Sequence, residues 1–254
     1  VVLRSRKQES AEQTVAAMQK SLEKLVAKER MSQEDADAAV ARVTATSKLD
    51  DLADCDLVIE SVVEDLATKV ALFNDLDHHC KDDAILATNT STLSVIEMAV
   101  ETRRPERVCG VHFFNPAPMM SLVEIIKTLV TSDETIAEVR QFAEACGKSP
   151  VEVKDRAGFI VNHLLFPYLN NAVRMLENGT ASRDDIDSAM KGGANFPMGP
   201  FALLDLVGLD TSLSILDALY DEFRDPHYAA SPMLRRMVTA GHLGRKSGAG
   251  FYEY

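Results

Sequence analysis

The sequence predicts a two-domain protein in which an α/β domain is followed by an all-helical domain. Up to about residue 154, short continuous apolar runs alternate with segments of helical period, which is typical of a sheet covered by helices. From Gly158 onward, apolar residues recur only at helical spacing. We therefore expect residues 1–154 to form the first domain and residues 155–254 the second.

Composition and charge argue against several classes of protein. With 254 residues, 46% of them hydrophobic, the chain can bury a substantial core. The formal net charge of −12 repels phosphate backbones, so we expect no nucleic-acid partner. No apolar run approaches the roughly 20 residues that span a bilayer, and the four cysteines stand singly, without metal-ligand spacing. We expect a soluble, cytoplasmic protein with reduced thiols, no metal and no membrane segment.

The first domain opens with strands and helices in alternation. Residues 1–3 look like the end of a buried strand, and the apolar spacing that follows predicts a helix across residues 15–26. Ser32 and Asp35 have the spacing of a capping box, which opens a short helix. The run at 55–63 is continuous, β-branched and bounded by acids, as expected of a parallel strand covered on both faces. The next helix turns Val70, Phe73 and Leu76 inward.

Four more strands complete this domain. They are predicted at residues 84–90, 108–114, 121–127 and 149–155, with one helix around residues 93–99. A second helix, with an apolar stripe from Ile136 to Cys146, stops at Gly147, a residue type that favours the left-handed conformation after a helix. Because strands and helices alternate, we expect a parallel sheet.

The second domain contains only helical signals. Apolar residues between 160 and 176 mark a long helix that ends at Gly179. The starts of the later helices are marked, in order, by Ser182 with Asp185, by Pro200 in a first turn, by Asp210 as the cap of a helix through Tyr220, and by Ser231 before Pro232.

One polar pair stands among the apolar strands. His112 lies near the end of the strand at 108–114, and Glu124 lies on the strand that follows. In open α/β sheets, ligands bind outside the carboxyl ends of strands. A histidine there can act as a general base if a carboxylate fixes its tautomer and stabilises the imidazolium. An isolated strand histidine is more often a hydrogen-bonded core residue, so the pair alone leaves both interpretations open.

The segment around this pair, GVHFFNPAPMMSLVEII, resembles the signature of the 3-hydroxyacyl-CoA dehydrogenase family, and it is similar above all to bacterial members that act on 3-hydroxybutyryl-CoA. The resemblance implies a Rossmann-like domain and a helical domain. It also implies reversible hydride transfer between C3 of acetoacetyl-CoA or 3-hydroxybutyryl-CoA and a nicotinamide cofactor. Further family blocks follow in order along the chain: DLVIESVVEDLATKVALF, LATNTSTLS, GFIVNHLL, GANFPMGPFALLDLVGLD and GRKSGAGFYEY.

The resemblance assigns roles to individual residues. It implies that His112 is the general acid and base, that Glu124 orients it, and that Ser91 and Asn162 position the substrate. For CoA it marks Ser21 and Lys28, and Lys20, Lys24 and Lys28 form a basic stripe at four-residue spacing that would equally suit a solvated face. For the cofactor it marks Glu64, Lys69, Asn89, Ser91, Asn115 and Lys246.

Two features depart from the family pattern. The glycine-rich phosphate loop and its strand do not precede Val1, so we expect roughly the first 25 to 30 family residues to be missing here, two sheet edges to be unpaired, and the cofactor to bind poorly. The acid that binds the ribose hydroxyls is replaced by Ser5, between Arg4 and Arg6. Guanidinium groups favour a 2′-phosphate, so NADP(H) is a plausible cofactor beside NAD(H).

Two alternative functions compete with that of a 3-hydroxyacyl-CoA dehydrogenase. One is a non-catalytic structural protein of the same fold, as in crystallins related to this family, and the other is a non-CoA hydroxyacid dehydrogenase. The intact catalytic set argues against the first, and the match at Ser21 and Lys28 argues against the second. We also expect a homodimer formed through apolar residues of the helical domain, namely Phe196, Phe201, Leu203, Leu204, Leu206 and Val207.

Overall fold

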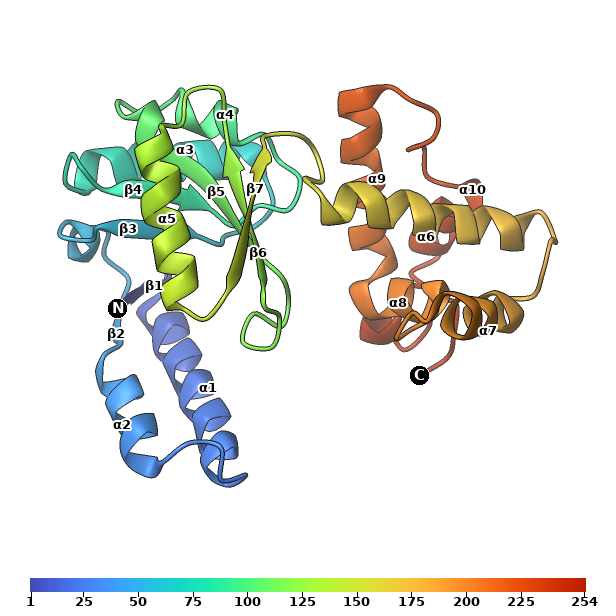
Figure 1. Ribbon diagram of the computed structural model, residues 1–254, viewed down its shortest axis with the longest axis horizontal. Coiled ribbons are helices and arrows are strands. Elements are labelled where there is room, and N and C mark those ends of the chain that lie inside the picture. The colour runs from blue at the N-terminus through green and yellow to red at the C-terminus, as the bar shows by residue number, and fades with distance from the viewer.

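The computed structural model describes residues 1–254 and divides them between a sheet-containing part and a helical part (Figure 1). The expected fold class is confirmed. The first part contains β1 (Val2–Arg4), α1 (Gln8–Val26), α2 (Gln33–Ala41), β2 (Thr44–Thr46), β3 (Leu57–Glu60), α3 (Leu66–His79), β4 (Ile85–Thr88), α4 (Val95–Ala99), β5 (Val108–Phe113), β6 (Leu122–Lys127), α5 (Asp133–Ala145) and β7 (Ser149–Lys154). The second contains α6 (Val161–Glu177), α7 (Arg183–Ala194), α8 (Pro200–Val207), α9 (Leu209–Phe223) and α10 (Pro232–Thr239).

The main sheet has five strands in the order β3-β4-β5-β6-β7. Its strands pair in parallel except β5 and β6, which pair antiparallel, so the expectation of a wholly parallel sheet was wrong at this one junction. The reason is the connection: no helix separates β5 from β6, and a short connection can join only antiparallel neighbours. The antiparallel register sets His112 directly opposite Glu124.

A second, two-stranded sheet pairs β1 with β2 in parallel. The strand β2 was not predicted from the sequence, because it has only three residues, is partly exposed and shows no apolar pattern. The helices α1 and α2 connect these strands as a hairpin that extends away from the main sheet (Figure 1). The hairpin has little core of its own, since Ala11 and Ala36 are the only fully buried residues of its two helices.

Side-chain caps begin several helices where the sequence predicts them. The hydroxyls of Ser32, Ser182 and Ser231 accept hydrogen bonds from backbone N–H groups three residues later. Pro200 occupies the first turn of α8, as expected. Asp210 does not cap α9, because α8 and α9 are separated only by Gly208, which takes the cap position at φ +102°; Asp210 lies in the first turn instead.

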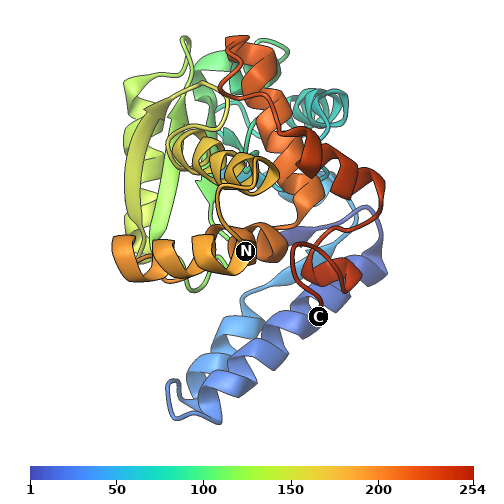
Figure 2. The ribbon, with the colours of Figure 1, turned by 90° about the vertical axis from the view of Figure 1, so that its right-hand side faces the viewer.

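Three apolar clusters form the interior. Two cover the faces of the main sheet and the third fills the helical domain, whose helices stand in front of the sheet when the molecule is turned (Figure 2). Phe201 and Leu204 belong to this third cluster and are buried inside their own domain, so they were wrongly expected at a dimer surface. The other apolar residues of α8 remain partly accessible, with Leu206 49% exposed and Leu203 and Val207 half-buried. None of the helices combines the length and hydropathy needed to cross a membrane.

Candidate active site

A buried histidine–carboxylate pair lies between the two domains. His112 is 5% exposed and Glu124 is fully buried, and Nδ1 of His112 lies 2.8 Å from Oε2 of Glu124. The other oxygen of Glu124 accepts backbone N–H bonds, both of 3.0 Å, from Ile160 and Val161 at the start of α6. A carboxylate is an acceptor only, so Nδ1 donates to Glu124, which leaves Nε2 as the ring nitrogen available for proton exchange.

Aromatic rings hold the imidazole from two sides. The ring of Phe114 lies 4.6 Å from that of His112, and the ring of Phe159 lies 5.6 Å from it, centroid to centroid. Phe159 comes from the connection between the domains, where it is buried and adopts φ +48°. Asp155 anchors the same connection by accepting N–H bonds from Val95 and Ile96, and burial raises the pKa of its carboxyl. The position of His112 therefore depends on how the two domains are joined.

Ser91 and Asn162 complete the group. The hydroxyl oxygen of Ser91 lies 3.2 Å from Nε2 of His112. Asn162 is 8% exposed on α6, and its side-chain amide donates to the carbonyl of Ser91 over 3.5 Å. Hence the four residues expected to be catalytic come together from both domains, with Ser91 facing the free nitrogen of His112.

Three of the expected cofactor residues form a network beside Ser91. Glu64 accepts hydrogen bonds from the turn at residues 90–92, including the N–H of Ser91 at 2.9 Å. Asn89 accepts from the N–H of Phe113 at 2.8 Å and donates to Ser61 at 3.2 Å, so both ends of its amide bind protein groups. Lys69 is 1% exposed, with Nζ 2.7 Å from Glu60 and 3.4 Å from Glu64.

Glu60, which is buried at the end of β3, was not predicted as a site residue. It is the nearest partner of Lys69 and also accepts a bond of 2.8 Å from the hydroxyl of Thr88 on β4. An acid that ends a buried, otherwise apolar strand was the available signal, because such a group requires partners.

Four other expected residues are not in contact with this group. Asn115 is exposed beyond the end of β5. Lys246 is exposed and pairs with Asp210 over 2.6 Å. Ser21 and Lys28 are exposed on the α1–α2 hairpin, and the Ser21 hydroxyl donates to the carbonyl of Ala17 at 3.0 Å.

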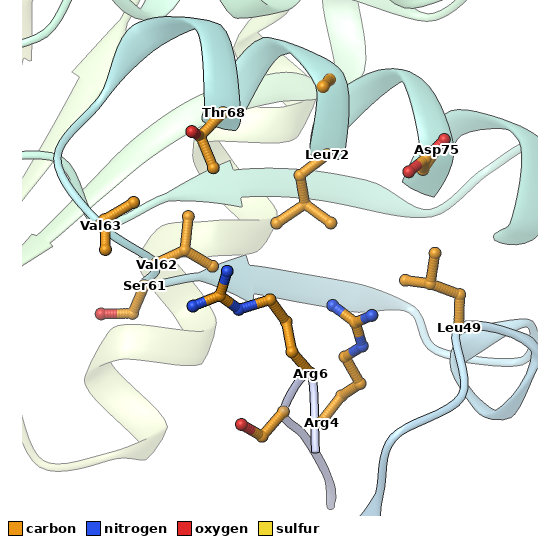
Figure 3. Close-up of a pocket in the computed structure, with 11 residues that line it drawn as sticks. Arg4, Arg6, Leu49, Ser61, Val62, Val63, Thr68, Leu72 and Asp75 are labelled. Atoms are coloured by element: carbon orange, nitrogen blue, oxygen red, sulfur yellow. The ribbon is translucent and has the colours of Figure 1, made fainter. Parts of the chain in front are cut away.

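The basic triplet at the end of β1 lines a pocket of about 480 Å³. Arg4, Ser5 and Arg6 form one wall, and residues 61–63 with the side of α3 form the other. Figure 3 shows both guanidinium groups directed from the strand toward α3 and the 61–63 segment. Nε of Arg4 is buried without a hydrogen-bond partner. Asp75 on α3 also lines this pocket. An unpaired buried donor beside two guanidinium groups fits an anionic group of a nucleotide.

Comparisons with known proteins cover the entire chain. A family model described as the NAD binding domain of 3-hydroxyacyl-CoA dehydrogenase matches residues 1–156, and the model for the C-terminal domain of the same family matches residues 158–254. Each domain therefore matches the corresponding part of one family.

Named relatives agree with the family models. The chain is 47% identical over 254 residues to a 3-hydroxybutyryl-CoA dehydrogenase of Clostridioides difficile, which covers all of this chain and 90% of that protein. It is 43% identical over 246 residues to a probable 3-hydroxybutyryl-CoA dehydrogenase of Bacillus subtilis, covering 97% and 86%. The crystal structure of (S)-3-hydroxybutyryl-CoA dehydrogenase from Ralstonia eutropha matches with a TM-score of 0.98 at 42% identity, covering 100% and 90%. The chain therefore belongs to the 3-hydroxyacyl-CoA dehydrogenase family, whose nicotinamide-binding domain it contains.

Proposed function

We propose that this protein is a short-chain L-3-hydroxyacyl-CoA dehydrogenase that interconverts 3-hydroxybutyryl-CoA and acetoacetyl-CoA. The observation that carries the proposal is the line from Ser91 through His112 to Glu124, with distances of 3.2 and 2.8 Å. The named relatives favour this function over a non-catalytic role.

His112 is proposed as the general acid and base. In the oxidation of the alcohol, Nε2 takes the proton of the C3 hydroxyl, and in the reduction of the ketone it returns that proton. Glu124 holds Nδ1–H and stabilises the imidazolium that forms. Because both groups are buried, their attraction is only weakly screened by solvent.

Ser91 and Asn162 are proposed to position the substrate. The Ser91 hydroxyl lies next to Nε2, so it can donate to the C3 oxygen while that oxygen faces His112. Asn162 comes from α6 and reaches the Ser91 carbonyl, so the correct placement of Ser91 depends on contact between the domains.

The nicotinamide cofactor, when bound, accepts or supplies the hydride. We propose that Glu64, Asn89, Asn115 and Lys246 contribute to its site, and that Arg4 and Arg6 make NADP(H) the preferred form. Three features of the pocket support this preference. Serine occupies position 5, where the family resemblance leads us to expect an acid. The Nε of Arg4 is buried without a partner, and the guanidinium groups of Arg4 and Arg6 line the same pocket. A 2′-phosphate gains both charge attraction and forked hydrogen bonds from such a pair.

Cofactor preference is tested by kcat/KM for NADPH and NADH. We expect NADPH to be favoured in the wild-type protein and Ser5→Asp to shift the preference toward NADH, because a carboxylate repels the 2′-phosphate and accepts from the ribose hydroxyls. Gln141→Glu, which adds the same charge at an exposed position of α5, is the control. A strong wild-type preference for NADH would overturn this part of the proposal.

The CoA moiety is proposed to contact Ser21 and Lys28 on the hairpin. Lys28 is exposed and would meet phosphate groups through charge attraction, which is sensitive to salt. Lys28→Ala should raise the KM for acetoacetyl-CoA, more strongly at low ionic strength, while Lys154→Ala, at the end of β7, leaves it unchanged.

We propose that the protein forms a homodimer through apolar side chains that remain exposed on the helical domain. Leu164 and Met175 are 69% and 43% exposed on α6, and Phe196, 42% exposed, packs its ring against Tyr168 of the same helix. A second copy of the chain would cover this apolar face. Sedimentation should give a dimer for the wild-type protein and a monomer for Leu164→Glu. The matched control is Leu129→Glu, which charges a 98% exposed leucine of the other domain.

The activity itself is tested by acetoacetyl-CoA reduction with the full-length protein, alongside acetoacetate as a non-CoA substrate. We expect reduction of the CoA ester, and a loss of about 10²- to 10⁴-fold in His112→Ala. His78→Ala, which removes an exposed histidine of α3, is the control. Equal turnover of acetoacetate would favour a non-CoA dehydrogenase, and no turnover of either substrate would favour the non-catalytic alternative.

A further inference from the structure

Lys69 is an unusual residue for a position inside α3. Its side chain is 1% exposed, and it is one of the largest fully buried side chains, beside several phenylalanines. Removing an ammonium group from water is unfavourable, and an apolar residue would fill such a position at lower cost. The function of this buried charge is therefore sought in the groups that the ammonium contacts.

Its nearest partner, Glu60, is rigidly held. Glu60 Oε1 lies 2.7 Å from the Lys69 ammonium and also accepts the N–H of Val62. Glu60 Oε2 accepts from the hydroxyl of Thr88 on the neighbouring strand. The carboxylate is therefore fixed by β3, β4 and the segment that follows β3, and it fixes the Lys69 ammonium in turn.

The second partner, Glu64, links this pair to the turn that carries Ser91. Glu64 Oε2 lies 3.4 Å from Lys69, while Oε1 accepts from the Thr90 hydroxyl and from the N–H groups of Ser91 and Thr92. The side chain of Glu64 is 40% exposed and is attached to the segment before α3, so the Lys69 charge is what draws it inward.

We propose that Lys69, held in place by Glu60, is a positioning residue of the active site. Acting through Glu64, it fixes the turn at residues 90–92 so that the Ser91 hydroxyl faces His112. The inference rests on the proposed dehydrogenase function and adds a role through protein contacts to the cofactor contact that the family resemblance implies for Lys69.

The proposal is tested with Lys69→Met, which keeps the length of the side chain and removes its charge. We expect kcat for acetoacetyl-CoA reduction at saturating cofactor to fall at least tenfold, in addition to any change in the cofactor Kd from NADH or NADPH fluorescence titration, because Glu64 is itself proposed to contact the cofactor. Lys81→Met removes a lysine that pairs with Asp56 at the surface beyond α3 and should change neither quantity. A weaker cofactor Kd with kcat retained at saturating cofactor would overturn the proposal and confine Lys69 to cofactor binding.

A double-mutant cycle tests whether Lys69 acts through Glu64. If it does, Lys69→Met combined with Glu64→Gln lowers kcat no further than the more severe single variant. Multiplicative losses would contradict the relay.

A charge-balanced variant covers the case in which Lys69→Met fails to fold because Glu60 is left unpaired. Glu60→Gln combined with Lys69→Met removes both buried charges, so we expect it to fold and still to lose kcat at least tenfold. Wild-type kcat in this folded variant would reduce the pair to a structural role.

A readout independent of turnover separates the relay from the proposed function. The ring-proton NMR signals of His112, assigned by their loss in His112→Ala, should shift in the charge-balanced variant because Ser91 leaves its contact with Nε2. If the wild-type protein shows no turnover, the proposed function fails, while this signal still tests the relay. Unchanged His112 signals would overturn it.

Discussion

Each of the two domains contains a buried carboxylate that accepts hydrogen bonds from the backbone N–H groups of a distant segment. The two carboxylates differ in the side chain that they also contact. In the α/β domain, Glu124 binds two backbone N–H groups through one oxygen and His112 through the other. In the helical domain, Asp205 binds the N–H groups of Phe251 and Tyr252 together with the Tyr254 hydroxyl. Both carboxylates connect distant segments, but only Glu124 faces a histidine, the side-chain type most often used for general acid–base catalysis.

A second aspartate of the helical domain follows the same rule as Asp205. Asp187 accepts from the N–H groups of Phe201 and Ala202 at the start of α8 and from the Tyr252 hydroxyl, and burial together with Asp187 raises the pKa of Tyr252. Neutral donors surround both aspartates. A buried carboxylate therefore suggests proton-transfer chemistry only when it also faces a side chain suited to general acid–base catalysis, as Glu124 faces His112.

The largest expected effect comes from deleting the shared carboxylate. Glu124→Ala removes the partner of His112 and leaves two N–H groups of α6 unpaired. We expect turnover to fall about 10²- to 10⁴-fold, and the free energy of unfolding to fall by about 2–4 kcal/mol. Steady-state kinetics and urea unfolding measure the two losses. A variant that keeps full turnover would contradict the distinction between the domains.

The next effect is on stability alone. Asp205→Ala removes the acceptor of the buried N–H of Phe251 and of the half-buried N–H of Tyr252, and the exposed Tyr254 hydroxyl loses its partner as well. We therefore expect a loss of about 2–4 kcal/mol in unfolding free energy. Turnover per folded molecule should be unchanged. A loss of kcat in protein that circular dichroism shows to be folded would contradict a purely structural role for Asp205.

Asp77 gives a smaller effect that depends on pH. Burial opposes its ionisation, but hydrogen bonds from Arg103 and Arg104 outweigh burial and hold the pKa of its carboxyl below the usual 3.8. The stabilisation is therefore complete above that value and is lost as pH falls through the lower, folded-state pKa. Asp77→Asn should be about 2 kcal/mol less stable at neutral pH, with the difference shrinking in acid. A difference that stays constant down to acid unfolding would contradict this.

The smallest effect is expected at the surface. Lys246 pairs with Asp210 while exposed, so Lys246→Met should leave the unfolding midpoint unchanged. If Lys246 also contacts the cofactor as proposed, the KM for the cofactor rises about twofold to fivefold, the factor equivalent to one surface ion contact. An unchanged KM would remove Lys246 from the proposed cofactor set.

The fold was largely predictable because its signals are local. Continuous apolar runs marked the buried strands, and serine caps marked helix starts at residues 32, 182 and 231. The antiparallel β5–β6 pair was missed although its signal was present, because no helix is predicted between the strands at 108–114 and 121–127 and so short a connection joins antiparallel neighbours. The apolar residues of α8 were divided between the core and the surface only by packing, which no local pattern specifies.

The candidate site was predictable where its residues lie near strand ends or in family blocks. His112 and Glu124 are on consecutive strands, and the antiparallel register then places them opposite each other. Glu60 and the burial of Lys69 escaped prediction, because a lysine near a helix start ordinarily faces solvent, and its burial depends on contacts with β3 and with the turn after β4.

The catalytic role of the Glu124–His112 pair is tested most directly by comparing two amide variants, Glu124→Gln and Asp205→Asn. The rate of acetoacetyl-CoA reduction is measured at a temperature where both variants are folded. The Gln side chain can still accept from the α6 N–H groups, but it lacks the charge that stabilises the His112 imidazolium. We predict a loss of about 10²-fold or more in Glu124→Gln and wild-type turnover in Asp205→Asn. Equal turnover in the two variants would contradict the claim that the pair of Glu124 and His112 performs the chemistry.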